Sequence, residues 1–261
     1  MRKHSILPRL VTVLFAVSAA HAGPPFLTDD PEPVEYRNWE FYIASMHTET
    51  ADGWVGTAPH LEINYGVITN VQLHLIAPIA YNAPDHGPFE YGYGDTELGA
   101  KIRFLQESKY LPMVGIFPLL EVPTGDSAQG LGSGQWDAFL PVWLQKSFGD
   151  FTVYGGGGYG INPGPGNQDW GFVGMVAQYQ IRKNFLLGGE IYHRTQTVTG
   201  GPDETAFNIG TVIDFSEHQH FMMSAGRSID GPTDFQVYVA WQFTFGPELF
   251  QSLNRLKNRG H

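Results

Sequence analysis

Apolar and polar residues alternate with a period of two along most of the chain after residue 37. The stretch GDTELGAKIRF, residues 94–104, is a clear example. Its two faces carry Leu98, Ala100, Ile102 and Phe104 on one side, and Glu97, Gly99, Lys101 and Arg103 on the other. Because successive side chains of a β-strand point to opposite faces, this pattern predicts strands with one apolar and one polar face.

Twelve segments show the pattern and are predicted to be strands. They span approximately residues 37–49, 54–66, 69–82, 94–107, 110–122, 135–148, 151–162, 169–181, 184–196, 205–215, 219–228 and 233–246. Most of them have ten to fourteen residues. Strands of soluble proteins usually have about five or six residues, whereas a tilted membrane-spanning strand needs about 9–11. Strand length therefore favours a barrel in a membrane.

The connections between these strands fall into two classes of length. Long connections follow odd-numbered strands and include YNAPDHGPFEYGYG, PTGDSAQGLGSG, NPGPGNQD and TQTVTGGPDET. Tight turns follow even-numbered strands: GVITN, QESKY, SFGD, RKN and SEHQ. Barrels of outer membranes have long loops at one rim and short turns at the other. The sequence therefore predicts an all-β fold, a transmembrane antiparallel up-and-down β-barrel of about twelve strands over residues 37–246, with both termini on the short-turn side.

Three segments lie outside the predicted barrel. Residues 1–22 combine a basic start, an apolar run and an A-x-A motif, which predicts a signal peptide. A membrane anchor is the alternative, but the apolar run is shorter than the about 20 residues of a spanning helix. Residues 23–36 predict an extended acidic arm, and residues 247–261 a short basic C-terminal tail with the spacing of an amphipathic helix. A frayed surface segment is the favoured interpretation of both flanks, and a lumen plug or rim contact is the alternative.

Composition narrows the class of protein further. The first 22 residues contain three basic and no acidic residues, so their removal changes the formal net charge from −11 to −14. This acidic balance argues against a nucleic-acid partner. With 32 glycines, 14% aromatic and 16% charged residues, and no cysteine, the chain suits an all-β barrel better than a soluble α/β enzyme. The expected partners are outer-membrane lipid, the barrel assembly machinery and small-molecule solutes.

The glycine run YGGGGYG, residues 154–160, lies within a predicted strand. It lacks the Lys-Ser/Thr pair and the following helix of a phosphate-binding loop, and alternating apolar residues flank it in strand register. Glycines inside a strand mark a bend or a close approach of another group. We expect Gly156 and Gly158 to face the lumen and leave room there, and Tyr154 and Tyr159 to cover the thin outer wall.

The polar faces of the predicted strands would line the lumen if the apolar faces meet lipid. The candidate lumen-lining residues are His60, Glu62, Gln72, His74, Glu97, Lys101, Arg103, Gly156, Gly158, Glu190, Arg194, Asn208 and Asp214. Charges of both signs inside a narrow barrel either pair and seal it or create a field that guides polar solutes. The sequence is therefore compatible with both a narrow conduit and an occluded barrel.

Catalytic and metal-binding patterns are weak in this sequence. His218 and His220 have a chelating spacing next to Glu217, but no third ligand accompanies them, so a solvated turn is the favoured interpretation. Ser224 lacks a GxSxG elbow, and pairing with His74 or His193 has no positive support. We expect no cofactor, no metal and no enzyme activity.

Several stretches resemble the outer-membrane proteins of the MetA-pathway of phenol degradation family. They are PPFLTDDPEPVEYRNWEFY, YGYGDTELGAKIRF, FLPVWLQKSFGDFTVYGGGGYGINPG, SEHQHFMMSAGRSI and WQFTFGP. The resemblance implies a channel or transporter-like barrel in the outer membrane of a Gram-negative cell, for passive passage of small aromatic or other hydrophobic compounds. A lipid-modifying barrel enzyme and a structural barrel with a closed lumen are the alternatives.

Overall fold

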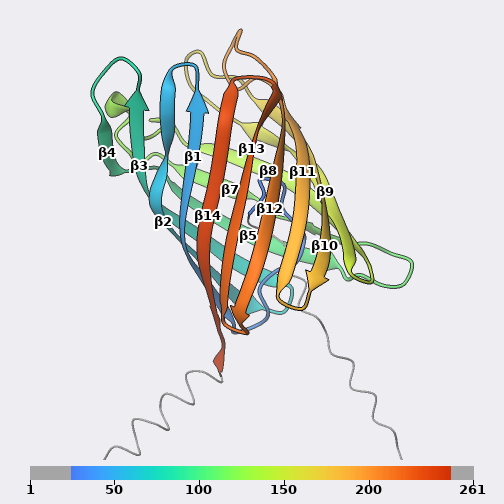
Figure 1. Ribbon diagram of the computed structural model, residues 1–261. Coiled ribbons are helices and arrows are strands. Elements are labelled where there is room, and N and C mark those ends of the chain that lie inside the picture. Colours follow the sequence, from blue (N-terminus) through green and yellow to red (C-terminus); the bar gives the residue numbers. More distant parts are fainter. Residues whose placement is uncertain (1–24, 248–261) are drawn as a thin grey trace, which may run out of the picture.

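A single antiparallel sheet that closes on itself forms the structure, a computed structural model that describes residues 25–247 (Figure 1). Its strands are β1 Trp39–Thr50, β2 Gly53–Ile68, β3 Val71–Pro84, β4 Glu90–Tyr93, β5 Thr96–Leu105, β6 Met113–Ile116, β7 Leu119–Val122, β8 Asp137–Phe148, β9 Phe151–Ile161, β10 Trp170–Arg182, β11 Phe185–Arg194, β12 Glu204–Ser216, β13 Gln219–Asp230 and β14 Thr233–Phe245. The first strand pairs with the last, from Trp39 opposite Phe245 to Thr50 opposite Thr233, and this pairing closes the barrel.

The fourteen strand segments form twelve positions around the barrel. Both β4 and β5 pair with β3, so together they occupy one position, interrupted at residues 94–95. Similarly, β6 and β7 both pair with β5 and β8 and are interrupted at Phe117 and Pro118. Proline has no backbone N–H to donate to the ladder, which explains the second interruption. The predicted twelve-stranded antiparallel barrel is confirmed.

Loop lengths agree with the sequence prediction except at the first and last hairpins and at the β5–β6 connection, residues 106–112, which is longer than a tight turn. The long connections are residues 85–89, 123–136, 162–169 and 195–203, at the upper rim of Figure 1. The same rim also carries two tight turns, which join β1 to β2 through residues 51–52 and β13 to β14 through residues 231–232. Gly231 has φ 138°, which L-residues rarely adopt and which allows this short turn. The expected strict alternation of long and short connections is therefore wrong at these two hairpins.

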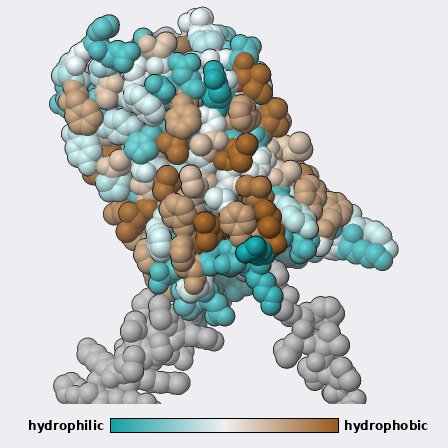
Figure 2. Space-filling model, viewed as in Figure 1, coloured by the Kyte–Doolittle hydropathy of each residue, from teal (hydrophilic) through white to brown (hydrophobic). Residues whose placement is uncertain are grey.

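Apolar side chains cover the outer wall of the barrel (Figure 2). Exposed large apolar residues occur on nearly every strand and include Leu73, Leu140, Val173, Ile191 and Ile209. In the view of Figure 2, hydrophilic residues gather at the upper and lower ends of the wall. An apolar band between polar rims is the outer surface expected of a transmembrane barrel. No helix among residues 25–247 is long and apolar enough to cross a membrane.

The N-terminal arm, described from residue 25 to residue 36, lies inside the barrel. Its residues Phe26, Thr28, Asp30, Pro31 and Val34 are buried. The structure thus places the arm in the lumen, the alternative that the sequence did not favour. The predicted signal peptide, residues 1–22, and all but the first residue of the predicted tail, 247–261, lie outside the described residues.

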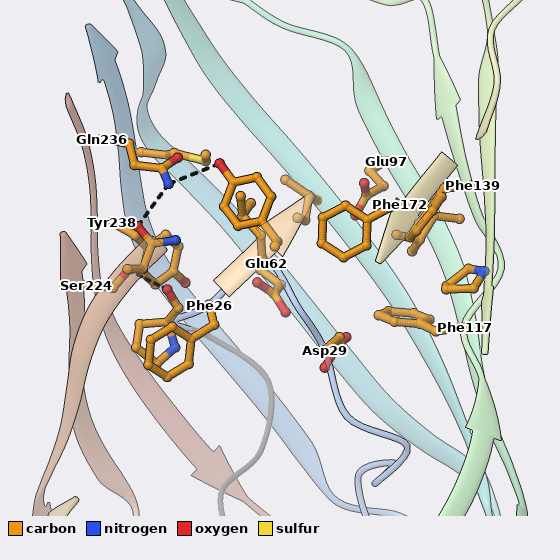
Figure 3. Close-up of a pocket in the computed structure, with 18 of the residues that line it drawn as sticks. Phe26, Asp29, Glu62, Glu97, Phe117, Phe139, Phe172, Ser224, Gln236 and Tyr238 are labelled. Carbon is orange, nitrogen blue, oxygen red and sulfur yellow. Dashed lines mark hydrogen bonds between the residues drawn. The ribbon is translucent and has the colours of Figure 1, made fainter. Parts of the chain in front are cut away.

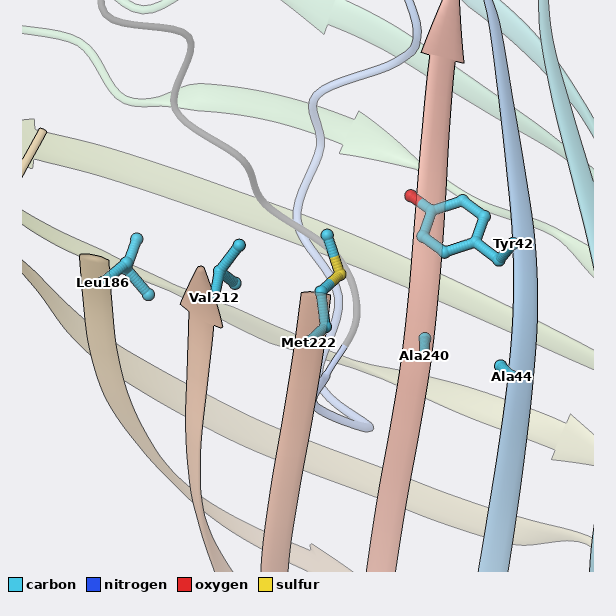
Figure 4. Close-up of a cluster of buried hydrophobic side chains, with 6 residues drawn as sticks. All are labelled: Tyr42, Ala44, Leu186, Val212, Met222 and Ala240. Carbon is cyan, nitrogen blue, oxygen red and sulfur yellow. The ribbon is translucent and has the colours of Figure 1, made fainter. Parts of the chain in front are cut away.

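The inner wall is not polar throughout. Six buried apolar side chains form a cluster across five neighbouring strands, near the rim with the chain ends (Figure 4). They are Tyr42, Ala44, Leu186, Val212, Met222 and Ala240. Because strands alternate their faces, these residues share the inner face with polar neighbours such as Ser224 and Gln242. The lumen therefore combines apolar and polar surfaces.

Candidate functional site

All thirteen predicted lumen residues lie on the inner face of the barrel. Five of them contact the arm or the residues that hold it: Gln72, Lys101, Arg103, Glu190 and Asn208. Four lie together near the middle of the lumen: His60, Glu62, His74 and Glu97. Arg194 and Asp214 pair with wall residues, and Gly156 and Gly158 lie beneath aromatic rings. The sequence gave no indication of these groupings.

Glu190 on β11 holds the beginning of the arm. The backbone N–H of Thr28 donates to Glu190 Oε1 at 2.5 Å, and that of Leu27 donates to Oε2 at 3.3 Å. Asn208 on β12 donates its amide to the same Oε2 at 2.7 Å. Hydrogen bonds to a charged group are stronger than those between neutral groups. The carboxylate therefore binds backbone groups of the arm that would otherwise lack partners inside the barrel.

Lys101 on β5 holds the middle of the arm. Its ammonium lies 3.0 Å from Asp29 Oδ1 and 3.8 Å from Asp30 Oδ1, and Lys101 is only 4% exposed. Burial raises the pKa of the Asp30 carboxyl, and the Lys101 charge offsets part of this effect. Further along, the backbone N–H of Val34 donates to Gln72 Oε1 at 2.8 Å. Wall residues thus anchor the arm along its length, from Leu27 to Val34.

Phe26 of the arm packs against the inner wall of the barrel. Its ring packs with Tyr154 on β9 and Val176 on β10. A Cβ at Gly188 or Gly210 would come within 3.0 and 2.9 Å of this ring, respectively. These two glycines therefore admit an aromatic side chain of the arm and do not widen a pore.

The glycine run of β9 also differs from the expectation. Gly156 and Gly158 do face inward, but Trp143 covers the first and Phe139 the second. Tyr154 is 2% exposed and points into the barrel, so the expectation that it covers the outer wall is wrong. Its position differs from Gly156 by two residues, which places both on the same face. Tyr159 lies on the outside, where its hydroxyl donates to Asp169 Oδ2 at 2.7 Å.

We expect the variant Gly156→Val to lower the yield of folded barrel. A Cβ at this position would overlap the backbone oxygen of Val142 and lie 3.0 Å from the Trp143 ring. Overpacking of this kind costs about 1–3 kcal/mol. Heat-modifiable gel migration and urea unfolding measure the effect, and Gly189→Val is the matched control, because its Cβ would lie 3.8 Å from the nearest atom. Equal folded fractions for the two variants would contradict the tight contact at Gly156.

Two cavities occupy the lumen on either side of the arm. The loop-side cavity has about 370 Å³, and the turn-side cavity has about 630 Å³. Trp170 and Arg194, near the rim of long loops, line the first, whereas Glu217 and Gly246, near the rim of tight turns, line the second. Four residues line both cavities: Asp29, Glu62, His74 and Phe117. These four residues therefore mark the narrow zone between the cavities.

A hydrogen-bond network centred on His74 holds this narrow zone. His74 Nδ1 lies 2.7 Å from Asn64 Oδ1, and His74 Nε2 lies 2.9 Å from Glu97 Oε1. The Asn64 amide donates to Glu62 Oε1 at 2.8 Å, which leaves its oxygen facing the imidazole. Two acceptors suit the doubly protonated form of the ring. The edge of the His74 ring also contacts Phe117, at 5.1 Å between ring centroids.

Aromatic side chains that the sequence did not identify as a group line the loop-side cavity. They are Phe117, Phe139, Trp143, Trp170, Phe172 and Tyr192. Phe139 stacks on Trp170 at 4.9 Å with an interplanar angle of 14°, and Phe172 stacks on Tyr192 at 5.7 Å. Figure 3 shows Phe117, Phe139 and Phe172 on the same side of this cavity. Since both faces of residues 139–144 are apolar, polarity did not separate the inner face from the outer face.

The catalytic and metal-binding candidates of the sequence form hydrogen bonds with other residues. Ser224 donates its hydroxyl to the Pro25 carbonyl at 2.5 Å, so it pairs with the arm and with neither candidate histidine. His193 lies 2.8 Å from Thr205 Oγ1. His220 is 2% exposed and bonded to Asp214, which corrects the expected solvated turn. Within residues 25–247, no three or more His, Cys, Asp or Glu side chains are grouped to hold a metal ion.

Comparison with known proteins supports the fold. No family model matches the sequence, and no curated protein matches it. The COG4313 outer membrane channel from Pseudomonas putida F1 superposes with a TM-score of 0.69 at 16% identity, over 83% of this chain and 98% of that one. The KdgM porin superposes with a TM-score of 0.53 at 12% identity, over 78% of this chain and 99% of that one. The shared property is the fold. At such low identity, the neighbours confirm the barrel and leave the solute and the family to be proposed.

Proposed function

We propose that this protein is an outer-membrane channel for small molecules, with its own N-terminal arm narrowing the lumen. The observation that carries the proposal is the pair of cavities, of about 370 and 630 Å³, on either side of the arm. The apolar outer wall and the channel and porin neighbours support the location and the class. In this proposal residues 1–22 act as the signal peptide that directs export.

Aromatic or other hydrophobic compounds are the proposed solutes. The resemblance to the MetA-pathway of phenol degradation family suggests this class, and the six aromatic residues of the loop-side cavity support it. Preorganised aromatic walls bind planar apolar groups without further ordering of side chains. The barrel would then accept such compounds from the long-loop rim and release them beyond the arm.

Planar-bilayer recording of the purified chain tests the channel. We expect small discrete currents, because the arm occupies much of the lumen, and larger currents when the arm is loosened. A barrel that folds, as heat-modifiable migration shows, but gives no current with the arm docked or loosened would contradict the channel. That result would favour a structural barrel with a closed lumen, which the buried arm also supports.

A further inference from the structure

We propose that the loop-side cavity is a binding site for a small aromatic cation, with one ring and an ammonium group. This inference deepens the proposed function, because it names the class of solute that would be held above the arm. The cavity, of about 370 Å³, lies within the size range of small-molecule sites in proteins. Its lining combines aromatic rings with several carboxylates.

The aromatic wall is held in a fixed arrangement by ring contacts. Phe139 lies between two partners: Trp170 stacks on it at 4.9 Å, and Phe172 meets it edge-on at 5.9 Å and 82°. Trp143 contacts Phe172 edge-on at 6.2 Å. The faces of aromatic rings carry negative electrostatic potential and attract cations as well as other rings. The wall therefore suits a ligand that is both aromatic and positively charged.

Carboxylates occupy the part of the cavity next to this wall. Figure 3 shows Asp29, Glu62 and Glu97 between the aromatic rings on one side and Gln236 and Tyr238 on the other. The basic groups beside them are fewer than the carboxyl groups. Lys101 serves both Asp29 and Asp30, and His74 serves Glu97 at 2.9 Å and Glu62 at 3.7 Å. Arg194, which also lines the cavity, is paired with Glu204 at 2.8 Å.

A row of carboxylates continues from the cavity toward the long loops. Glu97 on β5 lies directly opposite Glu121 on β7, which in turn lies directly opposite Asp137 on β8. Like charges at opposite positions of neighbouring strands destabilise a sheet. Among the described residues, no lysine, arginine or histidine forms an ion pair with Glu121 or Asp137. A cation bound beside Glu97 would favour the charged form of this row, whereas a bound anion would disfavour it.

Two residues that line the same cavity carry a buried polar atom without a hydrogen-bond partner among the described residues: Tyr238 at its hydroxyl and Trp143 at its indole N–H. A hydroxyl oxygen can accept a hydrogen bond from an ammonium group. The site therefore offers three features to one ligand: ring faces for its aromatic part, carboxylates for its charge and a free acceptor for its N–H groups.

Isothermal titration of the detergent-solubilised full-length barrel with four matched probes tests the inference. The probes are 2-phenylethylammonium, neutral 2-phenylethanol, anionic 3-phenylpropanoate and the non-aromatic 2-cyclohexylethylammonium. We expect 2-phenylethylammonium to bind about tenfold or more tightly than each of the others, since it alone uses both the rings and the carboxylates. Equal or tighter binding of the anion, of the alcohol or of the cyclohexyl amine would overturn the inference.

Two pairs of variants locate the site. Glu97→Gln should weaken binding of the ammonium probe about threefold to tenfold, whereas Glu49→Gln, on the outer face of β1, should leave it unchanged. Phe139→Leu should likewise weaken binding, and Phe148→Leu, on the outer face of the same strand, should not. Heat-modifiable migration shows whether each variant is folded. Unchanged binding in folded Glu97→Gln and Phe139→Leu would place the ligand elsewhere and overturn the inference.

The binding and channel proposals fail in different ways. A barrel that conducts but binds none of the four probes overturns the aromatic-cation site and leaves the channel intact. A barrel that binds 2-phenylethylammonium selectively but gives no current, with the arm docked or loosened, supports the site and contradicts the channel.

Discussion

Lys101→Met is expected to release the N-terminal arm from the lumen. The Lys101 ammonium is buried, 3.0 Å from Asp29 and 3.8 Å from Asp30. Removing one partner of a buried ion pair costs about 3–5 kcal/mol, because the remaining charges stay buried without compensation. The two carboxylates can regain water if the arm leaves its site. We therefore expect the ratio of docked to released arm to fall by about two orders of magnitude or more.

Labelling of a single cysteine measures this release. Thr28 is fully buried and the chain contains no cysteine, so Thr28→Cys reports on the arm without background. A water-soluble maleimide should label it slowly in the parent barrel and about a hundredfold faster with Lys101→Met. Lys146→Met is the control, because Lys146 pairs with Glu107 at the tight-turn rim and does not pair with the arm. Labelling that stays slow in Lys101→Met would contradict the anchoring role of Lys101.

A charge-matched rescue distinguishes release of the arm from a general loss of barrel stability. Asp29→Asn together with Asp30→Asn removes the two carboxylates that Lys101→Met leaves unpaired. We expect the triple variant to protect position 28 better than Lys101→Met alone, since no buried charge then lacks a partner. Fast labelling in the triple variant, as fast as in Lys101→Met, would mean that the charges of Asp29 and Asp30 do not drive the release.

Phe26→Ala is expected to loosen the beginning of the arm. The Phe26 ring is 9% exposed and packs with Tyr154 and Val176 over Gly188 and Gly210. Truncation of a buried phenylalanine costs about 3–5 kcal/mol. Because the ring belongs to the arm, this cost should appear as undocking of the arm, with the barrel strands still paired.

Single-channel recording and unfolding together test Phe26→Ala. We expect higher conductance than in the parent, with a urea midpoint of barrel unfolding that is nearly unchanged. Leu27→Ala is the neighbouring control, because Leu27 is 42% exposed and its backbone bond to Glu190 remains. A large loss of barrel stability without a change in conductance would show that Phe26 stabilises the barrel wall and does not hold the arm in the lumen.

The barrel could be predicted from the sequence because lipid imposes a simple pattern. Outward positions are mostly apolar, so period-two alternation marks most of the strands, and the twelve predicted strands match the number of positions. The interruption between β6 and β7 also has a local signal, Pro118, which the prediction of a continuous strand over residues 110–122 did not use.

The contents of the lumen could not be predicted in the same way. The acidic, proline-rich composition of the arm is compatible with a segment in water and with a segment in the lumen. Its partners also lie on strands that are distant in sequence: Glu190, for instance, is 162 residues from Thr28. Burial of Tyr154 was missed for a different reason. Its position relative to Gly156 places it inside, but the glycine run suggested empty space there.

Deletion of residues 25–34 tests whether the arm restricts an open-ended barrel. Single-channel conductance of the deleted chain should be compared with that of the parent, after heat-modifiable migration has shown that both are folded. We expect conductance to rise severalfold, since removal of the arm joins cavities of about 370 and 630 Å³. Equal conductance, or none in either folded barrel, would contradict a restriction of the lumen by the arm.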